Sequence, residues 1–294
     1  MSPDMSSSVA LVIKPRTRDL GGFEVARVLP YAKHRMVGPF IFFDRMGPSD
    51  FPAGEGINVR PHPHIGLATV TYLLDGEIMH RDDLGYAQAI RPGDVNWMTA
   101  GRGIVHSERT RDEVRDQPST VFGIQSWIAL PQDQEECDPG FFHHPADTLP
   151  VISQPGMDMR LIAGSAYGET SPVETASPMF YLDVHTDAGV TLDITNEYAE
   201  RAVYIVAGDI QLDGTSYGEN EMLVLNPDAD IDVTASSGTR FMLLGGDPID
   251  GERHIWWNFV SSSKERIEHA KDDWKSGRFG TIDGDDEFIP LPEK

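Results

Sequence analysis

Two short motifs place side chains that can bind a metal ion at a spacing of two residues. The first contains His62 and His64, and the second contains His106 and Glu108. On a β-strand, side chains two residues apart lie on the same face, about 7 Å from each other. If the two strands fold together, three imidazoles and one carboxylate converge. This ligand set suits iron(II) first, and nickel, copper, manganese and zinc are also compatible with it.

Four protein ligands leave about two positions open on an octahedral metal ion. Open positions can accept a substrate, water or dioxygen, so the set favours a catalytic or sensing site over a structural one. Pro63 lies between the first two histidines and has no backbone N–H to donate. Pro63 is therefore compatible with a first motif on an edge strand or at the start of a strand, where the missing N–H matters least.

Other residues near the motifs have two interpretations each. His80 and Asp82 could orient a ligand through hydrogen bonds, or they could form a polar turn. Four apolar residues could line a pocket for a flat aromatic ligand, or they could belong to the core: Phe42, Phe43, Trp97 and Met98. Four other histidines are interpreted as surface or structural residues: His143, His144, His185 and His254.

The elements that must position these residues are short apolar segments separated by glycine, proline and aspartate. The segments are rich in β-branched and aromatic residues, and Asp75-Gly76 is a tight-turn signal. Up to about residue 145 no segment has the pattern of an amphipathic helix, so an all-β barrel or sandwich is expected. The segments are VALVI (9–13), FEVARVL (23–29), FIFF (40–43), LATVTYLL (67–74), VNWM (95–98) and VFGIQSWIAL (121–130).

A change in composition divides the chain into two parts. Residues 131–150 are acidic, proline-rich and irregular, and short apolar segments resume after them. We therefore expect two domains, residues 1–145 and residues 146–294. TVTYLLDGEI (69–78) aligns with RAVYIVAGDI (201–210), which indicates an internal repeat. At the positions in the second copy that correspond to the first two histidines stand Ile194 and Asn196, so only the first domain is expected to bind a metal.

Residues 261–277 have the pattern of a helix, expected near 262–276 and assigned to the second domain. Ser262 and Glu265 have the spacing of a capping box. Ile267, Ala270 and Trp274 lie on one face at helical spacing. Gly277 follows as the expected helix end.

Composition narrows the class of protein. The chain has 294 residues with a net charge of −23, which argues against direct binding to nucleic acid or to an anionic membrane. The single cysteine, Cys137, excludes an internal disulfide framework and a cysteine-rich zinc site. The apolar run VALVI is too short for a secretory signal, and no run is long enough to span a membrane. A cytoplasmic monomer is expected.

The stretch from Gly38 to Glu108 resembles the pirin family of bicupins. The resemblance rests on GPFIFFDRMGP (38–48), HPHIGLATVTYLLDGEIMHRDDLG (62–85) and PGDVNWMTAGRGIVHSE (92–108), and the C-terminal WNFVSSSKERIEHAKDDWKSGRF is similar to bacterial members. It implies two jelly-roll cupin barrels face to face, with one metal in the N-terminal barrel. The iron ligands of the family fall on His62, His64, His106 and Glu108.

The resemblance implies two alternative functions. The first is a quercetin 2,3-dioxygenase-type enzyme that opens a flavonol with dioxygen. In this enzyme the metal lowers the pKa of the 3-hydroxyl, and Glu108 is the candidate catalytic base. The second is a non-catalytic, iron-dependent redox sensor that binds a partner protein, either as a transcriptional co-regulator or as a modulator of a metabolic enzyme.

Overall fold

The two motif strands pair with each other. The computed structural model describes residues 7–19, 23–227 and 229–293. In it the antiparallel pair β5 (Asn58–His64) and β10 (Ile104–Arg109) belongs to a four-stranded sheet in the order β5-β10-β7-β8, with β7 at Ile78–Asp82 and β8 at Ala87–Ile90. β5 is an edge strand of this sheet, which is a position where the missing N–H of Pro63 matters least.

A second, larger sheet accompanies the four-stranded one. Its order is β12-β9-β6-β11-β4-β3-β2. The bounds are β12 (Gly140–His144), β9 (Val95–Thr99), β6 (Leu67–Asp75), β11 (Ser119–Ala129), β4 (Phe40–Phe51), β3 (Glu24–Leu29) and β2 (Arg16–Asp19). β12 lies within the segment expected to be irregular; it is a strand because its backbone pairs with β9.

The same arrangement occurs a second time. A larger sheet has the order β1-β21-β18-β23-β16-β14-β13, with β15 paired to β14, and a smaller sheet has the order β17-β22-β19-β20. The larger sheet contains β1 (Val9–Ile13), β21 (Met222–Leu225), β18 (Glu200–Ala207), β23 (Arg240–Gly246), β16 (Met179–Thr186), β14 (Met157–Ala166), β13 (Val151–Gln154) and β15 (Glu169–Thr170). The smaller contains β17 (Val190–Ile194), β22 (Ile231–Ala235), β19 (Asp209–Leu212) and β20 (Thr215–Gly218). β6 and β18, the strands of the proposed sequence repeat, hold the same place in their sheets.

The chain folds into two compact units that interleave along the sequence. We call residues 17–27, 42–146 and 249–293 the site unit, and residues 7–16, 28–41 and 147–248 the second unit. The expected linear division at residue 145 therefore needs correction at both ends of the chain. β1 pairs with β21 and so belongs to the second unit, whereas the C-terminal helix belongs to the site unit.

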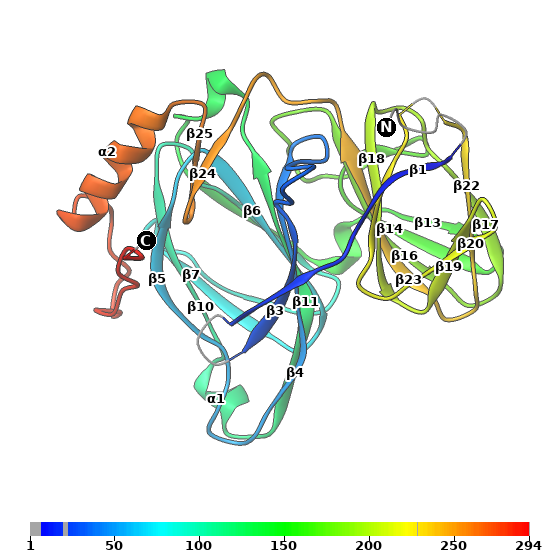
Figure 1. Cartoon of the computed structure of the whole chain (residues 1–294). Coiled ribbons are helices and arrows are strands. Elements are labelled where there is room, and N and C mark those ends of the chain that lie inside the picture. The colour runs from blue at the N-terminus through cyan, green and yellow to red at the C-terminus, as the bar shows by residue number, and fades with distance from the viewer. Residues whose placement is uncertain (1–6, 20–22, 228, 294) are drawn as a thin grey trace. The chain divides into compact units, whose positions relative to one another are not determined.

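The C-terminal helix α2 (Lys264–Lys275) follows a hairpin of β24 (His254–Trp256) and β25 (Phe259–Ser261). Figure 1 shows α2 beside β25 and β5, and its buried residues Ile267 and Ala270 pack with Ile65 and Phe259. The N-cap is Ser263, whose hydroxyl accepts from the backbone N–H of Arg266, and not Ser262 as expected. Ser262 is instead bound to the carboxylate of Glu135.

The remaining helical segments are short: α1 (Asp112–Arg115) and 3-10 turns at Gln132–Gln134 and Ala146–Thr148. The expected mostly β architecture with a C-terminal helix is thus confirmed. Within the part of the chain that the structure covers, no helix combines the length and apolarity that crossing a bilayer requires.

Candidate metal centre

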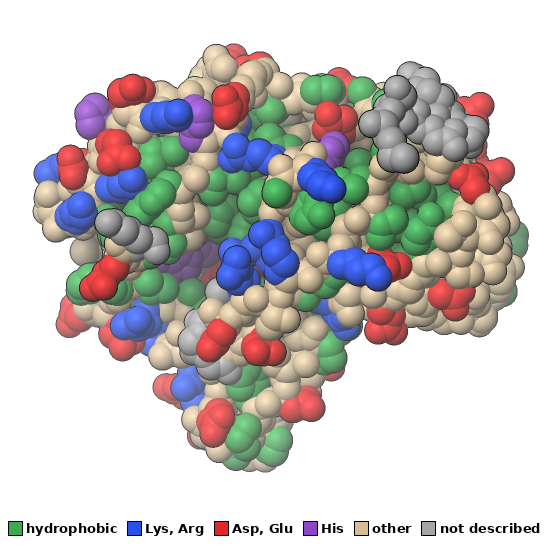
Figure 2. Space-filling model, viewed as in Figure 1, with side chains coloured by type: hydrophobic (Ala, Val, Ile, Leu, Met, Phe, Trp, Pro, Cys, Tyr) green, Lys and Arg blue, Asp and Glu red, His purple; other side chains and the backbone are tan. Residues whose placement is uncertain are grey.

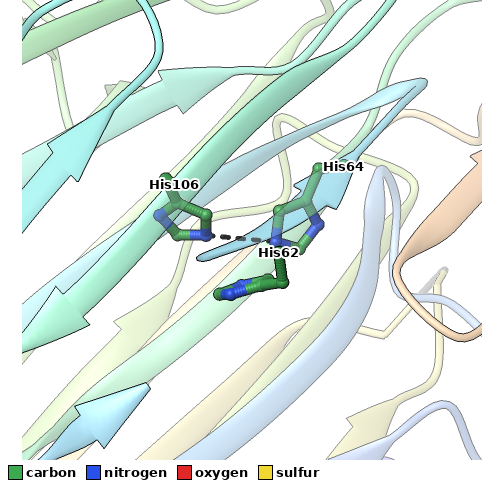
Figure 3. A group of neighbouring side chains, drawn as sticks. All are labelled: His62, His64 and His106. Carbon is green, nitrogen blue, oxygen red and sulfur yellow. Dashed lines mark hydrogen bonds between the residues drawn. The ribbon is translucent and has the colours of Figure 1, made fainter. Parts of the chain in front are cut away.

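Two neighbouring strands bring the three motif histidines together. His62 and His64 lie on β5, and His106 lies on β10 directly opposite His62 in the antiparallel register. Side chains two residues apart share a face of a strand, so both β5 imidazoles point to the same side as His106. Figure 3 shows the three rings directed toward one another from the two strands.

The ring nitrogens are close enough to share one ion. One ligand-capable nitrogen from each histidine lies within 4.8 Å of the other two. The Nε2 atoms of His64 and His106 are 3.1 Å apart. Two nitrogens bound to one ion at about 2.1 Å and at a right angle would be about 3 Å apart, so the spacing fits a metal site. It is the one group of three or more such ligands found among the described residues.

Backbone carbonyls orient two of the three imidazoles. The Nδ1 of His62 lies 2.8 Å from the carbonyl oxygen of Arg60, and the Nδ1 of His64 lies 3.2 Å from that of Asn258. A carbonyl can only accept, so each Nδ1 carries the proton and each Nε2 has a free lone pair. This arrangement of the outer hydrogen bond is the one that metal-binding histidines adopt.

The third imidazole is oriented by a buried pair of side chains. The Nδ1 of His106 is 3.4 Å from the Nδ1 of His80, and the Nε2 of His80 is 2.8 Å from Asp82 Oδ2. Both residues of the pair are buried on β7, and Phe141 stacks on His80 with ring centroids 4.2 Å apart. Of the two interpretations of the pair, the geometry fits the orienting hydrogen bonds.

Burial keeps the three imidazoles neutral. Desolvation lowers the pKa of His62 to about 4. It also lowers the pKa values of His64 and His106 well below the usual range, and the neighbouring histidines add to the effect in both cases. A neutral imidazole has the lone pair that a metal ion needs, so the centre is prepared for a cation at neutral pH.

Glu108 is close to the histidines along β10 but does not belong to their cluster. Its buried carboxylate accepts from Thr71 Oγ1 at 3.3 Å and from Gln125 Nε2 at 3.2 Å. The pairing of β10 with β5 shifts between His106 and Glu108, so Glu108 lies opposite Val59. Burial raises the pKa of the Glu108 carboxyl, and the two donors partly oppose this.

One of the four apolar residues with two interpretations lies against an aromatic ring beside the histidines. All four residues are buried: Phe42, Phe43, Trp97 and Met98. Phe42 stacks on Trp127 with centroids 4.0 Å apart, and the Trp127 ring meets His64 edge-on at 5.2 Å. An apolar aromatic wall therefore borders the histidine cluster.

Several residues at the centre were not identified from the sequence. Trp127, Thr71 and Gln125 lie on strands of the larger sheet, where the sequence shows only ordinary strand residues. Asn258 contributes a backbone oxygen from a distant hairpin, and such a contact has no signal in its residue type.

Known proteins are similar to this chain along nearly its whole length. The family model named Pirin matches residues 22–128, and the model of the Pirin C-terminal cupin domain matches residues 181–280. A pirin-like protein of Caulobacter vibrioides is 51% identical over 290 residues, which is 97% of this chain and 100% of that protein.

Two further relatives have names that describe an activity. A Pseudomonas aeruginosa protein, provisionally named quercetin 2,3-dioxygenase, is 39% identical and aligns over 90% of this chain and 83% of its own. A solved structure of quercetin 2,3-dioxygenase from Acinetobacter baumannii superimposes with a TM-score of 0.89 at 34% identity, covering 97% of this chain and 96% of that one. The two cupin domains expected from the sequence are thereby confirmed.

Proposed function

The chain belongs to the pirin family, and on this premise we propose that it is a metal-dependent dioxygenase that opens flavonols such as quercetin. The observation that carries the proposal is the cluster of three buried, neutral imidazoles beside an aromatic wall. The similarity to the quercetin 2,3-dioxygenase structure along nearly the whole of both chains supports it.

His62, His64 and His106 would hold the metal, which we propose to be iron(II). Glu108, which lies outside the histidine cluster in the structure, is the proposed fourth ligand. The fit is supported by the nitrogen spacing and by the outer hydrogen bonds that leave each Nε2 of His62 and His64 unprotonated. The metal would supply Lewis acidity toward a substrate hydroxyl and toward dioxygen.

Glu108 is the proposed catalytic base. A carboxylate whose pKa is raised by burial is a better proton acceptor near neutral pH than an exposed one. Glu108 accepts the proton of the flavonol 3-hydroxyl on a carboxylate oxygen, while Thr71 and Gln125 hold the group in place. Trp127, which meets His64 edge-on and has Phe42 stacked on its ring, would provide an apolar surface for the flat rings. The balanced reaction joins one flavonol with one dioxygen and releases carbon monoxide and the ring-opened ester.

Oxygen uptake tests this proposal. Metal-loaded protein should consume dioxygen and release carbon monoxide with quercetin, above a control with the same concentration of free metal. Glu108→Gln removes the base and should lower kcat by about 100-fold or more, which is the usual effect of losing general-base catalysis. The exposed Glu197→Gln is the matched control and should retain the wild-type rate.

Uptake no faster than that of free metal would contradict the proposal, because flavonols react with dissolved metal as well. That outcome would favour the alternative of an iron-dependent regulatory protein. Wild-type turnover by Glu108→Gln would leave the dioxygenase but remove Glu108 from the role of base.

A further inference from the structure

A cavity of about 730 Å³ lies on the outer side of the sheet that carries the histidines. Pro61 and Val105 line it, and they are the strand neighbours of His62 and His106. Adjacent side chains on a strand point to opposite faces, so the cavity and the metal centre lie on opposite sides of the same strands. The rest of the lining comes from the C-terminal segment between Trp274 and Leu291. The volume is that of a small-molecule site.

Three aromatic rings form walls of this cavity. The rings of Phe279 and Phe288 stand at 78° and 76° to the indole of Trp274, with centroids 5.8 and 6.2 Å from it. Trp274 Nε1 donates to the carbonyl oxygen of Ile289, which fixes the indole. Phe288 is 57% exposed, so its ring is accessible to a ligand from solution.

The lining of the cavity is also acidic. Four carboxylates of the C-terminal segment line it, and Lys275 is the one lysine or arginine in its lining. The four are Asp283, Asp285, Asp286 and Glu287. Arg109 pairs with Asp285 and Glu287, at 2.9 and 2.8 Å. Asp283 and Asp286 are exposed and have no ion-pair partner within the described part of the chain. In Figure 2 the surface over the C-terminal tail, below α2, shows hydrophobic side chains next to acidic ones.

We propose that this cavity binds a small organic cation with a quaternary or methylated ammonium group. Faces of aromatic rings attract such weakly hydrated cations, and perpendicular rings surround the rounded group from several sides. The carboxylates and the net charge of −23 draw cations to the site and disfavour anions. A divalent metal ion fits this cavity less well, because the walls are aromatic. Among the described residues, the group of converging metal ligands is the histidine cluster on the other face of the sheet.

Calorimetric titration of the full-length protein with choline tests the proposal. The matched neutral probe is 3,3-dimethylbutan-1-ol, in which a carbon atom replaces the nitrogen. Choline should bind with a dissociation constant of about 1 mM or below, and the neutral probe about tenfold more weakly, because only the cation gains from the rings and carboxylates.

Variants of the exposed Phe288 locate the binding site without disturbing the core. Phe288→Ala should weaken choline binding about fivefold, whereas Phe288→Tyr should retain it because the ring remains. Phe142→Ala changes another exposed phenylalanine, 54% exposed on β12, and should leave the affinity unchanged.

Three results would each overturn the proposal. Equal affinity for choline and its neutral analogue would mean that the cavity is merely apolar. Full choline affinity in Phe288→Ala would place the binding elsewhere. No choline binding at concentrations of about 50 mM would exclude a site of this class. None of these results depends on the histidine cluster, so they neither support nor contradict the proposed dioxygenase activity.

Discussion

At the scale of single residues, the proposed metal centre depends on which nitrogen of each imidazole already has a hydrogen-bond partner. Backbone carbonyls engage the Nδ1 atoms of His62 and His64, and His80 lies against the Nδ1 of His106. The opposite nitrogens then face one point, and burial keeps the rings neutral. The site is thus built before any cation arrives, which keeps the cost of ordering the ligands low.

This burial predicts how the stability of the metal-free protein depends on pH. The folded pKa of His62 is about 4, whereas that of an unfolded histidine is about 6.5. Between these values the unfolded chain binds more protons, so the free energy of unfolding falls as the pH falls from about 6.5 to about 4. His62 alone should contribute about 3 kcal/mol to this loss. His64 and His106 act in the same direction, and Glu108, whose pKa is raised, acts in the opposite one.

Urea denaturation between pH 7 and pH 4 measures this dependence. His62→Gln should have a shallower pH dependence than wild type, and the exposed His185→Gln should match wild type. An unchanged slope in His62→Gln would show that this ring titrates normally in the folded protein.

The buried His80–Asp82 pair should affect metal affinity without binding the metal. Asp82→Asn weakens the hydrogen bond that fixes His80, and His80 in turn lies against His106. Loss of an outer partner of this kind typically lowers metal affinity about 10- to 100-fold. Competition with a chelator measures it, and His143→Gln, which removes a histidine bound to Asn96, is the control. Equal affinities in all three proteins would assign His80 and Asp82 a purely structural role.

At the scale of elements, the C-terminal hairpin and helix support the centre from outside the barrel. The chain between β24 and β25 presents the Asn258 carbonyl to His64, and Phe259 is fully buried with Ile65 and Ile267. A side chain at Gly66 would overlap the Val260 carbonyl oxygen, so the close approach of β25 requires glycine there.

Phe259→Ala should therefore weaken both folding and metal binding. The cavity should cost about 3 to 5 kcal/mol of unfolding free energy. Metal affinity should also fall, because the hairpin that holds His64 loses its anchor. Phe241→Ala makes a comparable cavity in the core of the second unit and should destabilise the protein without changing metal affinity. The account of the hairpin fails if both variants bind metal equally well.

The elements also show where prediction from sequence reaches its limit. Strands such as β6 and β11 are recognisable because their apolar runs are local, and the spacing of the histidines follows from strand geometry alone. β12 has the sequence GFFHH and was missed because the segment around it is acidic and proline-rich, and these five residues form a strand through pairing with β9. Glu108 as a fourth ligand stays a prediction, and the pairing shift after His106, a property of two strands together, has no signal in the spacing.

At the scale of the molecule, one architecture occurs twice and one copy carries the candidate site. β17 and β22 of the second unit hold the places of β5 and β10. Their inward residues belong to a continuous apolar core: Leu192, Ile194, Ile231, Val233 and Ala235. In the alignment of the sequence repeat, Ile194 already stands at the position that corresponds to His62. The sequence did not indicate to which unit the two ends of the chain belong. β1 belongs to the second unit, and α2 belongs to the site unit.

The measurement that most directly tests the central claim is the metal content of the purified protein, for wild type, His106→Ala and the control His185→Ala. We predict close to one divalent ion per chain in wild type and in the control, and almost none in His106→Ala, because its nitrogen lies 3.1 Å from that of His64 at the point where the ligands converge. Wild-type metal content in His106→Ala, or no metal in any of the three proteins, would contradict the account of the site and with it the proposed function.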